Sequence, residues 1–354
     1  MESDVFSEAQ RRGHEQVSFF SFPAVGLKAI VAIHSTVLGP SLGGCRMRAY
    51  GSEGEAVEDV MRLAEGMTYK NALAGLDLGG GKACIIADHR ITEGRHALFR
   101  KFGECLNSLS GRYISAEDMG TSVPDVMAMK EVSSHVAGTD PAQGGGGDPS
   151  PWTAKGIFLG IHAACEHRYG TRNLKGRRVA LQGVGHVGMY LLELLVKEGA
   201  TVTVCDTYRA SLEVAAQRFG AIVVDPDAIY DVDAEIYSPC AVGQTVRPET
   251  LKRLRCEIIA GGANNQLLDN RMHRLIEEKG ILYCPDFVIN AGGVINVGAE
   301  YVPGGWKESW VAEKVERIYE TTKRVLAESK ARSKFSELVA LELAKERIDA
   351  RARA

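Results

Sequence analysis

Apolar and polar residues alternate in blocks that predict strands and helices along most of this 354-residue chain. In the first half, β-branched residues over 27–33 and a short apolar run over 83–87 predict buried strands. Apolar positions at helical spacing follow Ser52, and Glu55 completes the capping-box pattern with which a helix begins. A further helix is predicted over 97–109. The first half therefore mixes strands and helices.

The alternation is most regular in the second half of the chain. Strands are predicted over 178–182, 201–205, 235–237, 257–260 and 281–283, and helices over 153–168, 187–198 and 210–219. The stretch after residue 308 is charged and helical in pattern. Repeated strand–helix alternation is typical of a parallel, doubly wound sheet, so the predicted fold class is α/β.

A cluster of glycines and prolines separates the two halves. Gly144 to Gly147 is followed by Asp148-Pro149-Ser150-Pro151, which places four glycines and two prolines within eight residues. Such residues interrupt both helices and strands. We therefore expect a hinge or an interdomain connection here, and two domains in the chain.

Composition and charge narrow the class of protein. Hydrophobic residues make up 45% and charged residues 25% of the chain, which is the average composition of a globular protein. The formal net charge is -3, whereas a nucleic-acid-binding protein typically has a basic surface. The eight cysteines form no CxxC pair and several lie in apolar runs, so we predict reduced thiols and no metal site. Residues 1–4 do not resemble a signal peptide, and no apolar run is long enough for a membrane span. We expect a cytoplasmic protein that binds neither nucleic acid nor membrane.

One glycine-rich motif predicts a dinucleotide site. Gly183-Val184-Gly185-His186-Val187-Gly188 matches GxGxxG between a predicted strand and a predicted helix, and the next strand ends at Asp206, 23 residues after the first glycine. In such sites the glycines permit a tight turn, close approach of the pyrophosphate and close packing of the helix, while the acid binds the ribose hydroxyls. Asp206 would repel a 2′-phosphate, so the predicted cofactor is NAD rather than NADP. The alternative is a packing turn of an α/β domain that binds no cofactor.

Lysines and acids in the first half are the candidates for the chemistry. Lys70 lies at the end of the capped helix, and Lys82 follows Gly79-Gly80-Gly81 twelve residues later. Three consecutive glycines permit close approach of the backbone to a ligand. Glu117 and Asp118 lie in a weakly charged stretch. Each residue also fits a structural role, since lysines beside glycine turns are usually solvated and Asp118 is a suitable helix cap.

These stretches belong to a resemblance that extends from about residue 14 to about residue 345. The chain resembles the leucine/phenylalanine/valine dehydrogenase family, within the wider glutamate dehydrogenase superfamily. The motifs that carry the resemblance are Ala32-Ile33-His34, Leu38-Gly39-Pro40-Ser41-Leu42-Gly43-Gly44, Gly66-Met67-Thr68-Tyr69-Lys70-Asn71, Leu78-Gly79-Gly80-Gly81-Lys82, Gly111-Arg112-Tyr113-Ile114, Ala116-Glu117-Asp118, Gly147-Asp148-Pro149-Ser150-Pro151, Ser238-Pro239-Cys240-Ala241 and Asp286-Phe287-Val288-Ile289-Asn290-Ala291-Gly292-Gly293.

The resemblance implies an NAD-dependent amino-acid dehydrogenase with two domains around a cleft. Residues 1–147, joined by the C-terminal helix at about 330–354, are implied to be the substrate-binding and catalytic domain, and residues 148–329 the Rossmann-type NAD-binding domain. Lys82 is implied to be the catalytic lysine, which activates the water that attacks the imine. Asp118 is implied to carry protons to and from the substrate nitrogen, and Lys70 to bind the substrate carboxylate. The implied products are a 2-oxo acid and ammonia.

Further positions are implied only by the resemblance. The other implied substrate-binding residues are Leu42, Gly43, Met67, Ala116, Asn265, Asn290, Val294 and Val297, and the cofactor-binding residues outside the glycine motif are Asp206, Thr153, Cys240, Ala241 and Asn265. Leu42, Ala116 and the two valines are similar to the aliphatic walls of the leucine enzymes, so leucine or another branched-chain amino acid is the favoured substrate. The valines also fit an ordinary helix core. A phenylalanine or broad-range dehydrogenase is the alternative, and a non-catalytic NAD- and amino-acid-binding relative is a second.

The chain departs from the family pattern in two places. Tyr301-Val302-Pro303-Gly304-Gly305-Trp306 differs from the usual continuation and is close enough in sequence to Val297 to change the pocket mouth. The chain also stops at Ala354, whereas octameric leucine enzymes have a longer tail. We therefore expect a homo-oligomer, with a dimer favoured over an octamer.

Overall fold

The computed structural model describes residues 5–353, which divide into two compact units. Unit 1 comprises Met1–Pro149, Val294–Val311 and Ala344–Ala354, and unit 2 comprises Ser150–Gly293 and Ala312–Leu343. Residues 1–4, on which the expectation about a signal peptide depends, lie outside the described residues. Each unit has its own sheet, as expected for an α/β protein with a parallel second half.

Unit 1 contains a mixed sheet whose five strands lie in the order β1-β2-β4-β3-β5. The strands are β1 (Gln16–Phe22), β2 (Leu27–Ser35), β3 (Ser41–Arg48), β4 (Gly79–Ile86) and β5 (Tyr113–Glu117). β2 runs antiparallel to both β1 and β4, whereas β3 runs parallel to both β4 and β5. The register pairs Cys45 with Ala83 on one side and with Glu117 on the other. Lys82 precedes Ala83 and Asp118 follows Glu117. This register therefore places Lys82 and Asp118 on either side of β3, close to Cys45.

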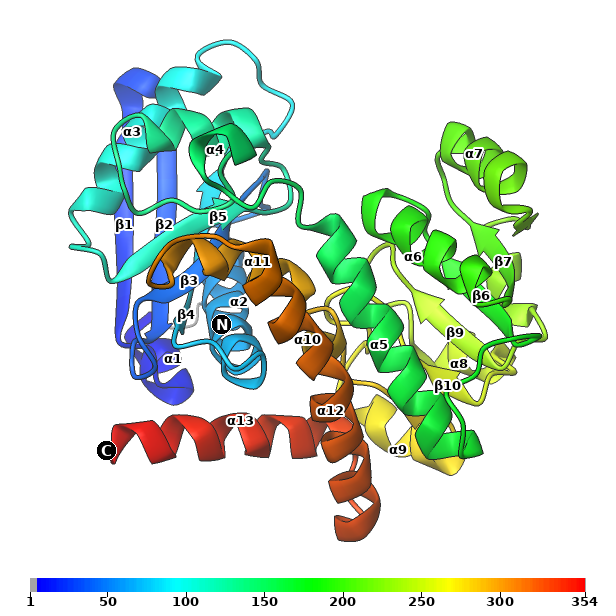
Figure 1. Cartoon of the computed structure of the whole chain (residues 1–354). Helices are drawn as coiled ribbons and strands as arrows, with labels where there is room; N and C mark the ends of the chain where they lie inside the picture. The colour runs from blue at the N-terminus through cyan, green and yellow to red at the C-terminus, as the bar shows by residue number, and fades with distance from the viewer. Residues whose placement is uncertain (1–4, 354) are drawn as a thin grey trace. The chain divides into compact units, whose positions relative to one another are not determined.

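Helices cover both faces of this sheet (Figure 1). The helical elements of unit 1 are α1 (Val5–Arg12), η1 (Pro23–Val25), α2 (Glu53–Leu73), α3 (Arg95–Asn107), α4 (Val123–Lys130), η2 (Pro141–Gln143) and η4 (Ala299–Tyr301), together with parts of α11 (Gly292–Gly298), α12 (Glu308–Arg332) and α13 (Ser336–Ala352). α2 begins where the capping pattern predicts, because the Ser52 side chain accepts a hydrogen bond from the Glu55 N–H. Val60 and Met61 of α2 pack on Ile30 and Cys84, whereas α3 and α4 pack on the alternate residues of β2 and β4.

Unit 2 contains a parallel sheet whose six strands lie in the order β11-β10-β9-β6-β7-β8. The strands are β6 (Arg178–Gln182), β7 (Thr201–Cys205), β8 (Ile222–Val223), β9 (Ile236–Pro239), β10 (Ile258–Ile259) and β11 (Leu282–Tyr283). The chain order reverses between β6 and β9, which is where doubly wound sheets bind their ligands. The predicted doubly wound parallel sheet is confirmed.

The helical elements of unit 2 connect these strands (Figure 1). They are α5 (Ser150–Tyr169), α6 (His186–Lys197), α7 (Arg209–Phe219), η3 (Ala228–Asp231), α8 (Pro248–Arg253), α9 (Arg271–Glu278) and α10 (Asp286–Ile289). The charged tail is two helices rather than one, because Ser333 adopts a positive φ of 49° between α12 and α13. Phe335 follows this break and stacks on Tyr283 and His273, with ring centroids 5.4 and 4.4 Å apart.

The segment Val294–Val311 belongs to unit 1, although the sequence-based division placed it in the second domain. Hydrogen bonds explain its position. The Glu300 carboxylate accepts the backbone N–H groups of Gly138, Thr139 and Gly146 at 2.9, 3.2 and 3.1 Å. Three backbone donors on one carboxylate attach the segment to residues 138–146.

Residues 301–306, which depart from the family pattern, also help to attach this segment to the rest of unit 1. The Tyr301 hydroxyl donates to the Ser134 carbonyl at 2.6 Å. The Trp306 Nε1–H donates to Asn296 Oδ1 at 2.8 Å, and Asn296 Nδ2 in turn donates to the Gly146 carbonyl at 3.2 Å. We call Asn296, Glu300, Tyr301 and Trp306 the loop clamp, because their side chains hold residues 134–146.

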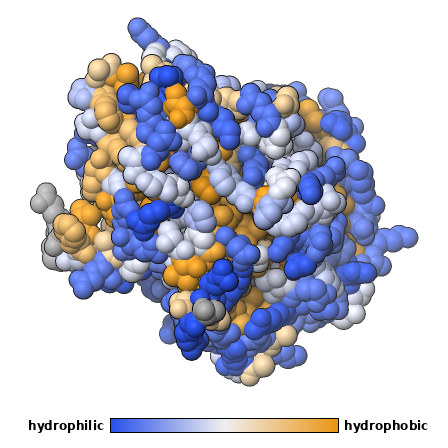
Figure 2. Space-filling model, turned by 60° about the vertical axis from the view of Figure 1, so that its left-hand side comes forward, coloured by the Kyte–Doolittle hydropathy of each residue, from blue (hydrophilic) through white to orange (hydrophobic). Residues whose placement is uncertain are grey.

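Hydrophilic side chains cover much of the face shown in Figure 2, with smaller apolar areas among them. Within residues 5–353 no helix is both long and apolar enough to cross a lipid bilayer.

Candidate active site

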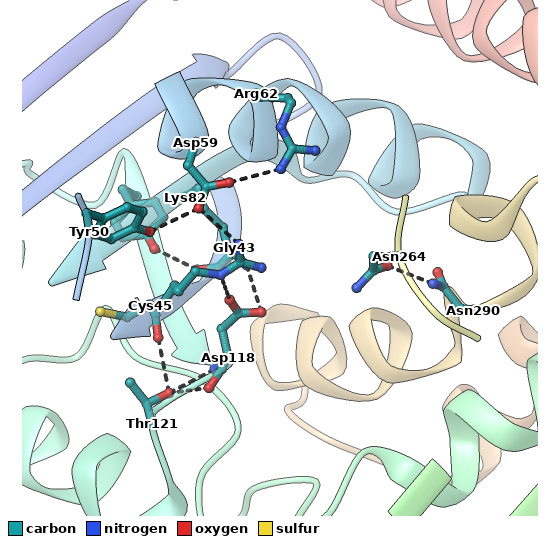
Figure 3. Close-up of polar contacts among 12 residues, drawn as sticks. Gly43, Cys45, Tyr50, Asp59, Arg62, Lys82, Asp118, Thr121, Asn264 and Asn290 are labelled. Carbon is teal, nitrogen blue, oxygen red and sulfur yellow. Dashed lines mark hydrogen bonds and ion pairs between the residues drawn. The ribbon is translucent and has the colours of Figure 1, made fainter. Parts of the chain in front are cut away.

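Lys82 and Asp118 form an ion pair within unit 1 (Figure 3). Lys82 Nζ lies 3.0 Å from Asp118 Oδ1. The Lys82 side chain belongs to β4 and is only about 6% exposed, whereas Asp118 directly follows β5. A Cβ on Gly44, in the intervening strand β3, would lie 2.7 Å from the Asp118 Cβ. Glycine at this position therefore lets the Asp118 side chain lie across β3 and reach Lys82.

Arg46 binds the second oxygen of the same carboxylate. Its Nε donates to Asp118 Oδ2 at 3.0 Å, and its Nη1 donates to Asp59 Oδ2 at 3.0 Å. Burial raises the pKa of Asp118, but the Lys82 and Arg46 cations outweigh that effect and hold it below its ordinary value. Arg46 and Asp59 were not among the residues predicted from the sequence. The available signal was an arginine between the apolar residues Cys45 and Met47, two residues after Gly44.

The glycines before Lys82 serve close packing between parts of the chain. A Cβ on Gly79 would lie 1.9 Å from the Ser35 carbonyl oxygen, and one on Gly80 would lie 2.1 Å from the Thr68 nitrogen. The run of glycines was predicted to permit close approach of a ligand, whereas the neighbours of Gly79 and Gly80 in the structure are β2 and the end of α2. Asn71 fixes the same contact by donating from Nδ2 to the Gly79 carbonyl at 2.5 Å. The end of α2, which carries Lys70, is thereby packed against the strand that carries Lys82.

The aliphatic residues proposed as pocket walls all lie in unit 1. Leu42 belongs to β3 and Ala116 to β5, and both are buried. Val294 and Val297 belong to α11, and a Cβ on Gly298 of that helix would lie 3.7 Å from the Leu42 side chain. Gly43 and Met67, two further substrate-binding candidates of unit 1, also lie close together, because a Cβ on Gly43 would lie 3.2 Å from the Met67 side chain.

The glycine motif of unit 2 has the local geometry of a dinucleotide loop. Gly183 has a φ of 98°, and a Cβ there would lie 2.8 Å from Ala241. A Cβ on Gly188 would lie 2.0 Å from the Gly183 carbonyl oxygen, so this glycine lets α6 pack close to the turn. A Cβ on Gly185 would meet nothing within 4 Å. The first and third glycines thus serve packing, while open space beside Gly185 leaves room for a ligand.

The surroundings of this loop also fit a dinucleotide. α6 begins at His186, and its N-cap residue Gly185 has no side chain that could accept a hydrogen bond from the first turn of the helix. The backbone N–H groups of that turn, which includes Val187, are therefore available to a phosphate. Asp206 accepts the Val184 and Tyr208 N–H groups, each at 2.8 Å, one on each oxygen. An ionised carboxylate has about four acceptor positions, so ribose hydroxyls can still bind it. A hollow of about 710 Å³ beside Asp206 is lined in part by Val223 and Val224, which suits an adenosine.

Asn290 and Asn265, the asparagine candidates of unit 2, make different contacts. Asn290 donates from Nδ2 to Asn264 Oδ1 at 2.7 Å (Figure 3) and to the Gly262 carbonyl at 3.1 Å. Its Oδ1 is buried and has no partner within residues 5–353. Asn265 instead has a positive φ of 53°, and its carbonyl accepts the Gln244 N–H at 2.7 Å. The structure therefore adds Asn264, which the sequence analysis missed, as the side chain that contacts Asn290.

The remaining unit 2 candidates lie at the ends of β9 and α5. Cys240 follows β9, and its sulfur accepts the Gly262 N–H at 3.3 Å. Thr153 is in the first turn of α5, where a Cβ on Gly292 would lie 2.9 Å from the Thr153 nitrogen. These contacts connect the ends of β9 and α5 with the segments that carry Asn264 and Asn290.

Comparisons with known proteins agree on one family. A family model described as Glu/Leu/Phe/Val dehydrogenase, dimerisation domain, matches residues 14–135, and one described as Glutamate/Leucine/Phenylalanine/Valine dehydrogenase matches residues 209–350. The chain is 47% identical over 345 residues to a leucine dehydrogenase of Thermoactinomyces intermedius, covering 98% of this chain and 93% of that protein. It is 44% identical over 319 residues to a phenylalanine dehydrogenase of the same organism, covering 90% and 86%.

A solved structure extends the likeness to three dimensions. The L-tryptophan dehydrogenase of Nostoc punctiforme matches with a TM-score of 0.85 and 38% identity, covering 99% of this chain and 100% of that one. Similar relatives therefore carry the names of three different substrates.

Proposed function

Because this chain belongs to the glutamate/leucine/phenylalanine/valine dehydrogenase family and is an amino-acid dehydrogenase, we propose that it oxidatively deaminates a branched-chain aliphatic L-amino acid, leucine above all, with NAD. The observation that carries the proposal is the buried Lys82–Asp118 ion pair, in the same unit as the aliphatic residues Leu42, Ala116 and Val297. A general base and a proton carrier in contact are what deamination through an imine requires.

The residues of unit 1 divide the reaction between them. Lys70 and the backbone at Gly43 bind the substrate carboxylate. A nicotinamide cofactor, when bound, would supply the acceptor for the hydride that leaves the substrate Cα. Lys82, in its uncharged form, takes a proton from the water that adds to the imine carbon, and Asp118 transfers protons to and from the substrate nitrogen. The amino acid, NAD⁺ and water thus become the 2-oxo acid, ammonium, NADH and a proton.

The geometry around Asp206 supports NAD as the cofactor. Its carboxylate is fixed by two backbone N–H groups beside the hollow that suits an adenosine. A negative charge there favours ribose hydroxyls and repels a 2′-phosphate. Asp206 therefore supports a preference for NAD over NADP.

An aromatic substrate is the second candidate, and a comparison with one relative supports it. A phenylalanine dehydrogenase of Bacillus thermotolerans is 47% identical over 313 residues, as similar as the leucine enzymes over a shorter stretch. Aliphatic pockets discriminate by only about 1–3 kcal/mol per methylene, so several side chains can be accepted. The branched-chain proposal depends on the bulk of Leu42, Val294 and Val297.

The deciding experiment follows formation of reduced cofactor at alkaline pH with leucine, valine, isoleucine, phenylalanine, tryptophan and glutamate in separate reactions, each with NAD and with NADP. We expect the highest kcat/KM with the aliphatic amino acids and NAD. Preference for an aromatic amino acid would agree with the proposed reaction but would contradict the assignment of the aliphatic pocket walls. Turnover of none of the six, with NAD still bound, would contradict the proposed function.

We also propose that the chain forms a homo-oligomer, with a dimer as its smallest unit. The support is the description of the family model over residues 14–135 as a dimerisation domain. Sedimentation velocity at micromolar concentration is expected to show no monomer, and a monomeric species alone would contradict this proposal.

A further inference from the structure

Arg46 connects two carboxylates from different parts of unit 1. Its side chain is only 11% exposed and comes from β3. It lies 3.0 Å from Asp59 of α2 and 3.0 Å from Asp118, which follows β5. Figure 3 shows Asp59 and Asp118 with the dashed contacts that join this network. A buried arginine between two carboxylates is charge-compensated, which is the condition under which such burial is tolerated.

We propose that Arg46 is a positioning residue for the amino-acid dehydrogenase reaction, which holds the Asp118 carboxylate ionised and oriented towards Lys82. The inference rests on the role of Asp118 as proton carrier in the proposed function. Arg46 touches neither substrate nor cofactor in this assignment, and it acts only through Asp118.

The other hydrogen-bond partners of each carboxylate show which one anchors Arg46 and which one Arg46 orients. Asp59 has other partners: Arg62 donates to its Oδ1 at 2.9 Å, and the Tyr50 hydroxyl donates to its Oδ2 at 3.0 Å. Asp118 Oδ2, in contrast, has Arg46 as its only side-chain partner recorded within residues 5–353. Asp59 therefore anchors Arg46, and Arg46 in turn fixes Asp118.

The Asp118 backbone is fixed without Arg46. Its N–H donates to Thr121 Oγ1 at 2.9 Å, and that hydroxyl lies 3.1 Å from the Cys45 carbonyl oxygen (Figure 3). What Arg46 adds is the orientation of the carboxylate and a compensating charge. Replacing Arg46 is therefore expected to alter the carboxylate and leave the chain path unchanged.

The charges around Asp118 give the sign of the expected pH effect. The titratable groups that interact with it are Lys82 on β4, Arg46 and Cys45 on β3, and Tyr113 on β5, whereas Asp59 on α2 contacts Arg46. Lys82 and Arg46 are the two cations that lower the pKa of Asp118. Without Arg46 the carboxyl group takes up its proton at a higher pH. The expected effect is therefore a higher pKa of the Asp118 carboxyl group, and a protonated Asp118 cannot accept a proton.

The test compares Arg46→Gln with Arg46→Lys and with the control Arg62→Gln. Arg62 binds the same Asp59 but not Asp118, and its side chain is 42% exposed. We expect Arg46→Gln to lower kcat by about 10–100-fold with little change in the KM for the amino acid, and to raise the pKa of Asp118. Arg46→Lys should restore part of both, and Arg62→Gln should keep both near the wild-type values.

A wild-type kcat in Arg46→Gln would overturn the inference, as would the same rise of the Asp118 pKa in Arg62→Gln or a change in KM alone. Should Arg46→Gln fail to fold, Asp59→Asn removes the anchor but keeps the guanidinium, and a smaller shift of the same sign is expected. NMR titration of isotope-labelled aspartate, with Asp118→Asn to assign the signal, measures the Asp118 pKa without turnover. An unchanged Asp118 pKa would refute the role of Arg46, whereas inactivity of the wild-type enzyme on every amino acid would refute the proposed function instead.

Discussion

Replacing Lys82 with Ala is expected to lower kcat by about 10²–10⁴-fold while NAD binding stays near its wild-type strength. Lys82 is the general base in the proposed reaction, and it is buried beside Asp118 in unit 1, whereas the glycine motif lies in unit 2. Steady-state kinetics at alkaline pH and calorimetric titration with NAD measure the two quantities separately.

Lys28→Ala is the matched control for this variant. Lys28 is also a strand lysine of unit 1 in an ion pair, but it is exposed and its partner is Glu53. Exposed ion pairs contribute about 0–1 kcal/mol, so this variant should keep wild-type turnover and stability. A nearly wild-type rate in Lys82→Ala would remove Lys82 from the chemistry.

Asp118→Asn is expected to lower kcat by about 10²–10⁴-fold, because an amide of the same shape cannot accept and return a proton. The variant also leaves the Lys82 and Arg46 cations close together without the carboxylate between them, which should reduce the free energy of unfolding. Steady-state kinetics and denaturant unfolding measure the two effects.

Asp125→Asn separates the loss of a buried carboxylate from the loss of the proton carrier. Asp125 is 4% exposed and paired with Arg95 through both oxygens, as Asp118 is paired with Arg46 and Lys82. We expect this control to lose stability but to keep most of its kcat. Equal losses of kcat in the two variants would argue that Asp118 serves folding alone.

The strands that could be predicted from the sequence are those rich in β-branched or apolar residues. β6 and β7 have the predicted bounds, Arg178–Gln182 and Thr201–Cys205. β3 was not predicted, because Gly43, Gly44 and Arg46 interrupt its apolar pattern. β4 was predicted only from residue 83, since glycine has weak strand propensity, yet Gly79 to Gly81 are strand residues because their neighbours leave no space for a side chain.

The candidate site was predicted from the family resemblance, and its supporting contacts were not. No local pattern places Lys82 beside Asp118, because their contact depends on how β4 and β5 pair with β3. Arg46 and Asp59 meet only through the packing of α2 on the sheet. Of the adjacent residues Asn264 and Asn265, it is Asn264 that contacts Asn290, whereas Asn265 adopts a positive φ, and no local pattern distinguishes the two.

The loop clamp places a limit on how substrate preference can be exchanged between relatives. Val294 and Val297 share one short segment with Asn296, Glu300 and Trp306, and a Cβ on Gly146 would lie 2.6–2.7 Å from the Asn296 and Trp306 side chains. A chimera that receives residues 294–306 therefore also needs glycine at position 146, because any other residue there displaces both side chains and breaks their hydrogen bonds. Recombination within the family would have to transmit these two distant stretches together. A point mutation at Val297, in contrast, changes the proposed pocket wall and is expected to leave the clamp intact.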